Sequence, residues 1–294
     1  MKAILSNKIK VIAIVGATAS GKTAYSIDLA KKIDGEIISA DSRIVYKDLD
    51  IGTAKPTKEE MCGIPHYMID IVEPTFDYSA GLYKQQASEI IKNISFRGKI
   101  PIVVGGTGLY TDILLKGFDL PNIKPDKKMR AKLEKLSNEE LYEMLENKDK
   151  FGAQTIDKND RKKIIRSIEI IAQTGNTLAN SRGKSISEYD VEWIGKNYPR
   201  EILYQRINNR IDIMLEQGLI EETKELLNKY GRAYNIINTI GYREIIQYLD
   251  GILSMDESIE LLKKNTRNYA KRQLTWFRKN ADIKWDVFPE KLNK

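Results

Sequence analysis

Short apolar runs alternate with amphipathic helical patterns in the first third of the chain. Apolar and β-branched residues are concentrated at 11–15, 36–39 and 100–104, and helical periodicity covers 22–33 and 83–93. Strands that are apolar on both faces are typical of a parallel sheet with helices packed on each side. The pattern therefore predicts an α/β fold built on a doubly wound parallel sheet.

The pattern changes at Pro121, after which charged sequence carries leucines and isoleucines at helical spacing. Residues 160–173 show the clearest amphipathic helix in this segment. We therefore expect a mainly helical inserted subdomain at 121–195, within a core formed by 1–120 and 196–294. Further helices are expected in the core at 205–217, 221–229, 240–249 and 256–280.

Composition narrows the class of protein. The chain has 294 residues, of which 41% are hydrophobic, enough for a sizeable buried core. No apolar run approaches the roughly 18 residues that span a bilayer, and the first strand follows without a signal-peptide pattern. The single cysteine excludes an intramolecular disulfide and a cysteine zinc cluster. We expect a cytoplasmic monomer without a membrane partner, and the net charge of +7 favours polyanionic partners or scattered surface lysines.

A phosphate-binding loop is predicted directly after the first strand. Residues 16–23, GATASGKT, fit the pattern G-x-x-x-x-G-K-[ST] between a strand and a helix. Gly16 and Gly21 let the backbone direct its N–H groups at phosphate oxygens, while Lys22 supplies a positive charge and Thr23 a hydroxyl for Mg²⁺. The sequence thus predicts a diphosphate site in a P-loop-type fold, without identifying the molecule that carries the diphosphate.

Two other motifs follow strands of the same predicted sheet. Asp41 comes after 36–39, and residues 105–110, GGTGLY, come after 100–104. Because ligands gather at the carboxyl ends of parallel strands, we expect these motifs to share one crevice with the phosphate loop. Asp41 is placed to act as a general base, or alternatively as a helix N-cap or an outer ligand of Mg²⁺. Glycine instead of Asp at residue 105 disfavours ATP or GTP hydrolysis, and Thr107 would face the ligand.

Other polar residues have more than one interpretation. Segments 158–166 and 263–279 are basic, which fits contact with a nucleic acid backbone or a solvated helix face. Arg206 and Arg210, four residues apart, would face an anion or an acidic neighbouring helix. His66 is the only histidine, and we interpret it as structural because no second His or Cys completes a metal site.

Together these motifs resemble the tRNA dimethylallyltransferases (tRNA isopentenyltransferases), of the bacterial type. The likeness runs from Gly16 to Arg278, and its most specific parts are 50–56, DIGTAKP, and 269–278, YAKRQLTWFR. The resemblance implies an enzyme that transfers the dimethylallyl group of dimethylallyl diphosphate to N6 of adenosine 37, beside the anticodon, in tRNAs that read codons beginning with U. Its products would be N6-dimethylallyladenosine (i6A) and diphosphate.

The resemblance also implies roles for individual residues. Asp41 would accept the N6 proton, Arg210 would reach the diphosphate, and Thr23 would hold Mg²⁺ as well as act in catalysis. The residues that would bind the prenyl diphosphate are Gly16, Thr18, Ala19, Ser20, Gly21, Lys22 and Thr23. The residues that would contact the anticodon stem-loop of tRNA are Asp41, Ser42, Arg43, Ile44, Thr107, Arg130, Lys162, Lys163, Ile164, Ile165 and Arg166.

The chain departs from the family pattern at three positions. Ala17, Ile44 and Tyr67 stand where Pro, Gln and His are common. Ile44 weakens the expectation of a side-chain hydrogen bond to the base. Without the resemblance, the pattern favours a P-loop small-molecule or nucleoside kinase, and a nucleotide-gated RNA-binding module and an adenylate isopentenyltransferase are further alternatives. The insertion and the aromatic-rich C-terminal helix favour a macromolecular acceptor.

Overall fold

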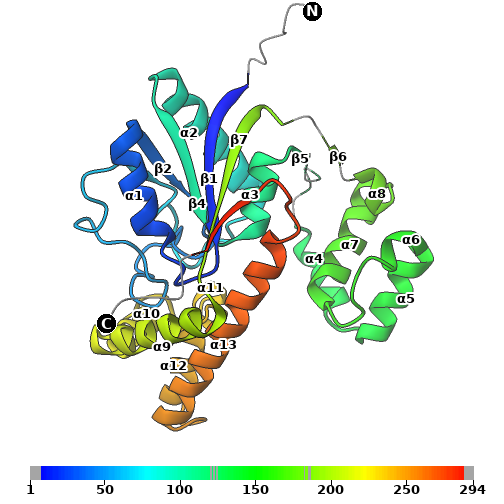
Figure 1. Ribbon diagram of the computed structural model, residues 1–294. Coiled ribbons are helices and arrows are strands. Elements are labelled where there is room, and N and C mark those ends of the chain that lie inside the picture. Colours follow the sequence, from blue (N-terminus) through cyan, green and yellow to red (C-terminus); the bar gives the residue numbers. More distant parts are fainter. Residues whose placement is uncertain are drawn as a thin grey trace, which may run out of the picture. The chain divides into compact units, whose positions relative to one another are not determined.

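A computed structural model describes residues 8–287, except 120, 122, 124, 182, 185 and 186. It consists of two compact units, which Figure 1 shows. The core unit comprises Met1–Leu115 and Glu188–Lys294, and the insertion comprises Lys116–Ser187. None of the helices in the described ranges is long and apolar enough to cross a membrane.

The core unit contains a six-stranded sheet with the order β3-β2-β4-β1-β7-β8, and all its described strand pairs are parallel. At its centre β1 lies between β4 and β7, so that Ile14 pairs with Val104 on one side and with Ile194 on the other. The strands are β1 (Ile9–Gly16), β2 (Gly35–Ser39), β3 (His66–Tyr67), β4 (Ile100–Gly105), β7 (Tyr189–Asn197) and β8 (Lys284–Val287).

Helices cover both faces of this sheet. On β2, Ile37 packs in one cluster with Ile27 of α1, and its neighbour Ile38 packs in another with Tyr83 of α2. Because successive strand residues point to opposite faces, α1 and α2 lie on opposite sides, which confirms the predicted doubly wound sheet. The helices of this unit are α1 (Lys22–Ile33), α2 (Ala80–Phe96), α3 (Gly108–Leu115), α9 (Arg200–Glu216), α10 (Leu219–Tyr230), α11 (Tyr234–Ile237), α12 (Tyr242–Leu249) and α13 (Met255–Phe277).

The insertion has its own hydrophobic core. Leu141 and Leu145 of α5 are buried in one cluster with Ile164 and Ile168 of α7. These residues recur at helical spacing, so each helix presents one apolar face to the other. The elements of this unit are β5 (Phe118–Asp119), α4 (Lys127–Leu133), α5 (Asn138–Lys148), α6 (Lys150–Ala153), α7 (Arg161–Thr174), α8 (Leu178–Ser181) and β6 (Gly183–Lys184), and β5 and β6 pair antiparallel.

The boundaries of the insertion differ from the expected 121–195. Residues 189–195 belong to β7, which pairs with β1 along its length and buries Trp193 in the core cluster. Charged residues such as Asp190 and Glu192 interrupt this strand, so its sequence lacks the apolar run that marks β1 and β4. The compact units therefore meet in sequence at residues 116 and 188.

Candidate active site at the carboxyl edge of the sheet

The predicted phosphate loop connects β1 to α1. At Gly16 a Cβ atom would lie 2.2 Å from the Lys196 carbonyl oxygen of β7, so a side chain does not fit. Gly21 adopts a φ of 80°, which glycine tolerates without strain, and α1 begins at the next residue. The first turn of α1 carries no acidic residue, so its N–H groups and the positive end of the helix dipole remain suited to an anion.

Lys22 lies with its ammonium group turned back toward this loop, where it donates a hydrogen bond to the carbonyl oxygen of Ala17. The pKa of Lys22 is lowered to about 7: burial is the largest cause, the cation of Arg210 acts in the same direction, and the carboxylate of Asp41 opposes both. Lys22 and Arg210 repel each other when no ligand is bound, so the electrostatics of the site favour a polyanion.

Arginines of α9 hold the loop from the other side. The Nε of Arg206 donates to the Ala19 carbonyl oxygen at 2.9 Å, and the Nη1 of Arg210 donates to the Thr18 hydroxyl at 3.3 Å. Burial, followed by the neighbouring cation of Arg206, lowers the pKa of Arg210. Of the two interpretations of this arginine pair, the structure favours the one in which they face an anion, because both bond to the predicted phosphate loop.

Asp41 and Thr107 lie together at the same edge of the sheet. The Oδ1 of Asp41 accepts a hydrogen bond from the Arg43 N–H at 2.8 Å, which forms a turn, and no helix begins there. The Thr107 N–H donates to the Ala40 carbonyl oxygen at 3.2 Å, and the Thr107 Oγ1 accepts from the Ser42 N–H at 3.1 Å. The predicted convergence of the β2 and β4 motifs is confirmed, and the N-cap interpretation of Asp41 is wrong.

Sequence reasoning gave no role to Gln273 of α13, whose side chain is 5% exposed. Its Oε1 accepts from the Thr18 N–H at 2.8 Å, and its Nε2 donates to the Gly106 carbonyl oxygen at 2.9 Å. On the same helix, burial and the nearby carboxylate of Asp41 raise the pKa of Tyr269 to about 12, so its phenol is neutral at physiological pH. Through α13, therefore, the phosphate loop, Asp41 and the glycine-rich turn after β4 form one site.

Ile44 was expected among the residues that contact tRNA, but its side chain is buried, with 9% exposed. Its carbonyl oxygen accepts a hydrogen bond from the Asp70 N–H at 3.1 Å. The side chain is apolar and lies in the protein interior, so it does not offer a side-chain contact to tRNA here, and a contact through the backbone at Ile44 stays a prediction. Ser42 and Arg43, which precede it, are partly exposed.

In the insertion, the residues expected to contact tRNA divide into two classes. Ile164 and Ile165 are buried in the cluster between α5 and α7, so their side chains stabilise the insertion and do not face a ligand. This corrects the expectation for both isoleucines. Lys162 and Lys163 precede them on α7 and are exposed, as an RNA contact requires.

Arg130 and Arg166 surround a buried carboxylate, that of Glu169. The Nη2 of Arg130 lies 2.8 Å from Glu169 Oε2, and Arg166 pairs with the same oxygen. Burial raises the pKa of Glu169, but the hydrogen bonds from both arginines outweigh it and leave this pKa below its usual value. Both arginines are partly exposed, yet each neutralises a group with no access to solvent. Their first role is therefore to stabilise the insertion.

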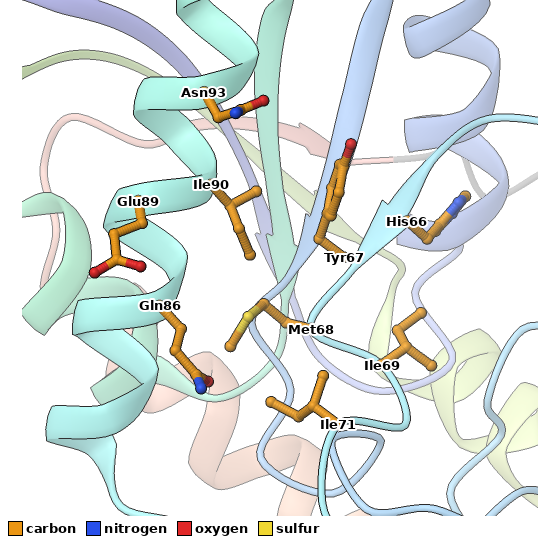
Figure 2. Close-up of a pocket in the computed structure, with 9 residues that line it drawn as sticks. All are labelled: His66, Tyr67, Met68, Ile69, Ile71, Gln86, Glu89, Ile90 and Asn93. Carbon is orange, nitrogen blue, oxygen red and sulfur yellow. The ribbon is translucent and has the colours of Figure 1, made fainter.

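His66 and Tyr67 lie on the edge strand β3. The Nδ1 of His66 lies 2.7 Å from the Ile64 carbonyl oxygen, and burial lowers the pKa of this imidazole, consistent with a structural histidine. The Tyr67 hydroxyl donates to Glu36, which is also bonded to Arg97. A groove of about 640 Å³ lies between β3 and α2. Figure 2 shows residues that line it, with His66 directed away from α2. This groove lies beside β3, whereas the phosphate loop follows β1.

The segment 50–56 is held by Glu222 of α10. The Glu222 carboxylate accepts hydrogen bonds from the Ile51 N–H at 2.7 Å and the Gly52 N–H at 3.0 Å, and the Tyr242 hydroxyl donates to it at 2.6 Å. A Cβ at Gly52 would lie 2.5 Å from the Tyr242 ring. This segment therefore packs the α10 and α12 helices against the core, which gives it a structural role.

Comparison with known proteins supports the resemblance found in the sequence. A family model described as IPP transferase matches residues 44–280, and one described as isopentenyl transferase matches residues 9–73. The tRNA dimethylallyltransferase of Carboxydothermus hydrogenoformans is 47% identical, over 97% of this chain and 94% of that protein. The corresponding protein of Staphylococcus carnosus is 45% identical, over 95% of this chain and 92% of that protein.

Solved structures agree. The tRNA isopentenylpyrophosphate transferase of Bacillus halodurans is 43% identical and superposes with a TM-score of 0.73, covering 95% of this chain and 90% of that one. A eukaryotic dimethylallyltransferase acting on tRNA is 32% identical with a TM-score of 0.83, covering 95% of this chain and 73% of that one.

Proposed function

The chain belongs to the IPP transferase family, and from this membership we propose that it transfers the dimethylallyl group of dimethylallyl diphosphate to N6 of adenosine 37 in tRNAs that read codons beginning with U. The products are i6A and diphosphate. The observation that carries the proposal is the meeting of a phosphate loop, the cations Lys22 and Arg210, and the carboxylate of Asp41 at one edge of the sheet.

The diphosphate is the leaving group in this reaction. As the bond between the allylic carbon and the diphosphate oxygen breaks, the electron pair leaves with that oxygen, so negative charge grows there. The N–H groups at the start of α1, Lys22 and Arg210 are fixed before the reaction, so they stabilise this charge without reorganising. In this proposal the loop holds a departing group, and no phosphoryl group is transferred.

Asp41 supplies the base. The N6 amine of adenine is a poor nucleophile because its lone pair is delocalised into the ring, and bond formation to carbon makes its proton acidic. The Asp41 carboxylate takes this proton as the new C–N bond forms. One oxygen of Asp41 is held by the Arg43 N–H, which fixes the side chain. No described residue donates a hydrogen bond to its other oxygen, Oδ2, so this atom is suited to the proton transfer.

Mg²⁺ fits the site as a partner of the diphosphate. The described residues contain no cluster of three or more His, Cys, Asp or Glu that would bind a metal by themselves. The hydroxyl of exposed Thr23 is the protein ligand that the loop offers. Mg²⁺ is commonly bound by few protein ligands together with phosphate oxygens and water, and when bound it neutralises charge on the diphosphate.

A direct assay tests the proposed function. We expect the protein with Mg²⁺ to transfer label from dimethylallyl diphosphate to unmodified tRNA that carries adenosines 36 to 38, and to release diphosphate only when that tRNA is present. Digestion of the product to nucleosides locates the label on N6 of adenosine 37. Transfer of label from γ-labelled ATP, with none from the prenyl donor, would identify a kinase instead. Prenylation of free AMP but not of tRNA would identify an adenylate isopentenyltransferase.

The insertion is proposed to contribute phosphate contacts. Changing Lys162 and Lys163 together to Gln should weaken tRNA binding and reduce the slope of log affinity against log salt by roughly 0.7–0.9 per lost contact. Arg166 is left intact, because its loss would leave the buried Glu169 carboxylate with less compensation. Filter binding across a salt series measures the slope.

A matched control separates this effect from net charge. Lys31 and Lys32 end α1 in the core unit and are both exposed, so changing them to Gln removes the same charge elsewhere. This control should keep the slope of the unmodified protein. Equal slopes for both double variants would show that α7 carries a solvated face and makes no phosphate contact.

A further inference from the structure

Gln273 is the side chain that bonds to both the phosphate loop and the turn after β4. Its amide oxygen accepts from the Thr18 N–H and its amide nitrogen donates to the Gly106 carbonyl oxygen, across 255 and 167 positions of sequence. With 5% of the residue exposed, water does not replace either bond easily, and an unpaired buried group is costly. The two backbone segments are therefore held at a fixed separation by one planar group.

The space around this amide is filled. A Cβ at Gly106 would lie 2.1 Å from the Nε2 of Gln273, and 3.4 Å from the carbonyl oxygen of Gly16. Any side chain at Gly106 would displace the amide. The end of a glutamine side chain carries both a donor and an acceptor, so a single residue meets both requirements.

Each end of this bridge leads to a different part of the site. At one end, the Thr18 N–H donates to Gln273 of α13 and the Thr18 hydroxyl accepts a hydrogen bond from Arg210 of α9. The backbone and the side chain of Thr18 are therefore held by different helices. At the other end, Gly106 precedes Thr107, whose hydroxyl accepts a hydrogen bond from the Ser42 N–H beside Asp41. A displacement of Thr18 therefore reaches the residues beside the proposed base through a continuous set of hydrogen bonds.

We propose that Gln273 is a positioning residue that couples occupation of the phosphate loop to the geometry of the turn after β4, on the side of the site where the RNA would bind. This inference rests on the proposed function, since it assigns diphosphate to the loop and RNA to the other side. Diphosphate bound by residues 16–23 fixes Thr18, and the amide of Gln273 then fixes Gly106 and the turn that carries Thr107. Binding of the two substrates is mutually reinforced, because coupling between two sites is reciprocal.

Hydrogen exchange tests the coupling without RNA. Inorganic diphosphate with Mg²⁺ should protect amides in residues 16–23 and also in residues 105–112 of the unmodified protein. In Gln273→Met, which keeps the length of the side chain and removes both bonds, protection of 16–23 should remain while protection of 105–112 is lost. Gln247→Met on α12 is the matched control and should behave as the unmodified protein. Should Gln273→Met fail to fold, Gln273→Glu, which keeps an acceptor for Thr18 and loses the donor to Gly106, supplies the same comparison.

Binding of tRNA gives a second measurement. We expect diphosphate with Mg²⁺ to tighten tRNA binding by about fivefold or more in the unmodified protein, and by less than about twofold in Gln273→Met. The inference would be overturned if diphosphate tightened tRNA binding by the same factor in both proteins, or if hydrogen-exchange protection in the unmodified protein were confined to residues 16–23. Either result would leave the proposed function intact. A complete lack of diphosphate binding would overturn both, whereas failure of label transfer alone counts against the proposed function.

Discussion

Changing Lys22 to Met should lower the rate of prenyl transfer by about 10²–10³-fold, the usual effect of removing one preorganised group that stabilises transition-state charge. The ammonium group lies against the phosphate loop and is largely desolvated, so its attraction for the departing diphosphate is weakly screened. Met keeps the aliphatic part of the side chain. Single-turnover measurements with bound substrates report the chemical step, and Lys31→Met at the exposed end of α1 is the control.

The lowered pKa of Lys22 gives this prediction a second signature. Folding brings the pKa of Lys22 from its ordinary value of 10.5 to about 7, so the unfolded chain binds more protons between these values. This residue's contribution to stability therefore rises with pH across that window. Bound diphosphate should raise the pKa again, because an opposite charge favours the ammonium form. At pH 8 the unmodified protein should therefore take up more protons on binding diphosphate than Lys22→Met does.

Calorimetry in buffers of different ionisation enthalpy measures this proton uptake. Since both proteins bind the same diphosphate and Mg²⁺, the difference in proton uptake between the unmodified protein and Lys22→Met reports the protonation of Lys22. The ligand-free Lys22→Met protein should be no less stable than the unmodified one at pH 6, where charging the desolvated amine is costly. A transfer rate within a few-fold of normal, with unchanged proton uptake, would show that Lys22 does not face the leaving group.

The parts of the site that could be predicted are those encoded by contiguous sequence. A buried strand, a glycine-rich turn and a helix beginning at Lys22 define the phosphate loop locally, and parallel strand order then brings Asp41 and Thr107 to the same edge. Gln273 could not be found in this way. In the sequence it is one polar residue within a 23-residue helix, and its role depends on where α13 packs against the sheet edge.

The expected tRNA contacts of Ile164 and Ile165 were wrong because one role was assigned to every residue from 162 to 166. Ile164 and Ile165 lie on the apolar face of α7, and their helical spacing indicates burial independently of any family likeness. The lysines just before them are exposed on the same helix.

For the boundary of the insertion, the sequence signal itself is weak, because β7 alternates charged and apolar residues where β1 does not. Its place in the sheet is determined by pairing with β1, a contact between distant segments.

Changing Asp41 to Asn should lower turnover by roughly a hundredfold or more, the usual effect of removing a general base, while affinity for tRNA and for the prenyl diphosphate stays within a few-fold. The amide oxygen of Asn can still accept the hydrogen bond from the Arg43 N–H, so the turn after β2 should persist. Asp28→Asn, on the exposed side of α1, is the matched control. If Asp41 were instead an outer ligand of Mg²⁺, the variant would lose activity mainly through weaker binding of Mg²⁺, and excess Mg²⁺ would restore it.

The proximity of Asp41 to Lys22 requires one more comparison. The Asp41 carboxylate raises the pKa of Lys22, so Asp41→Asn should lower that pKa further and leave fewer protein molecules with a charged Lys22 at pH 8. Part of the rate loss at pH 8 would then be electrostatic and not due to a missing base. At pH 6 Lys22 is mostly charged in the unmodified protein, and bound diphosphate favours the charged form in both. A loss that persists at pH 6 therefore assigns proton transfer to Asp41, whereas recovery to near-normal turnover at pH 6 would show that Asp41 acts by keeping Lys22 charged.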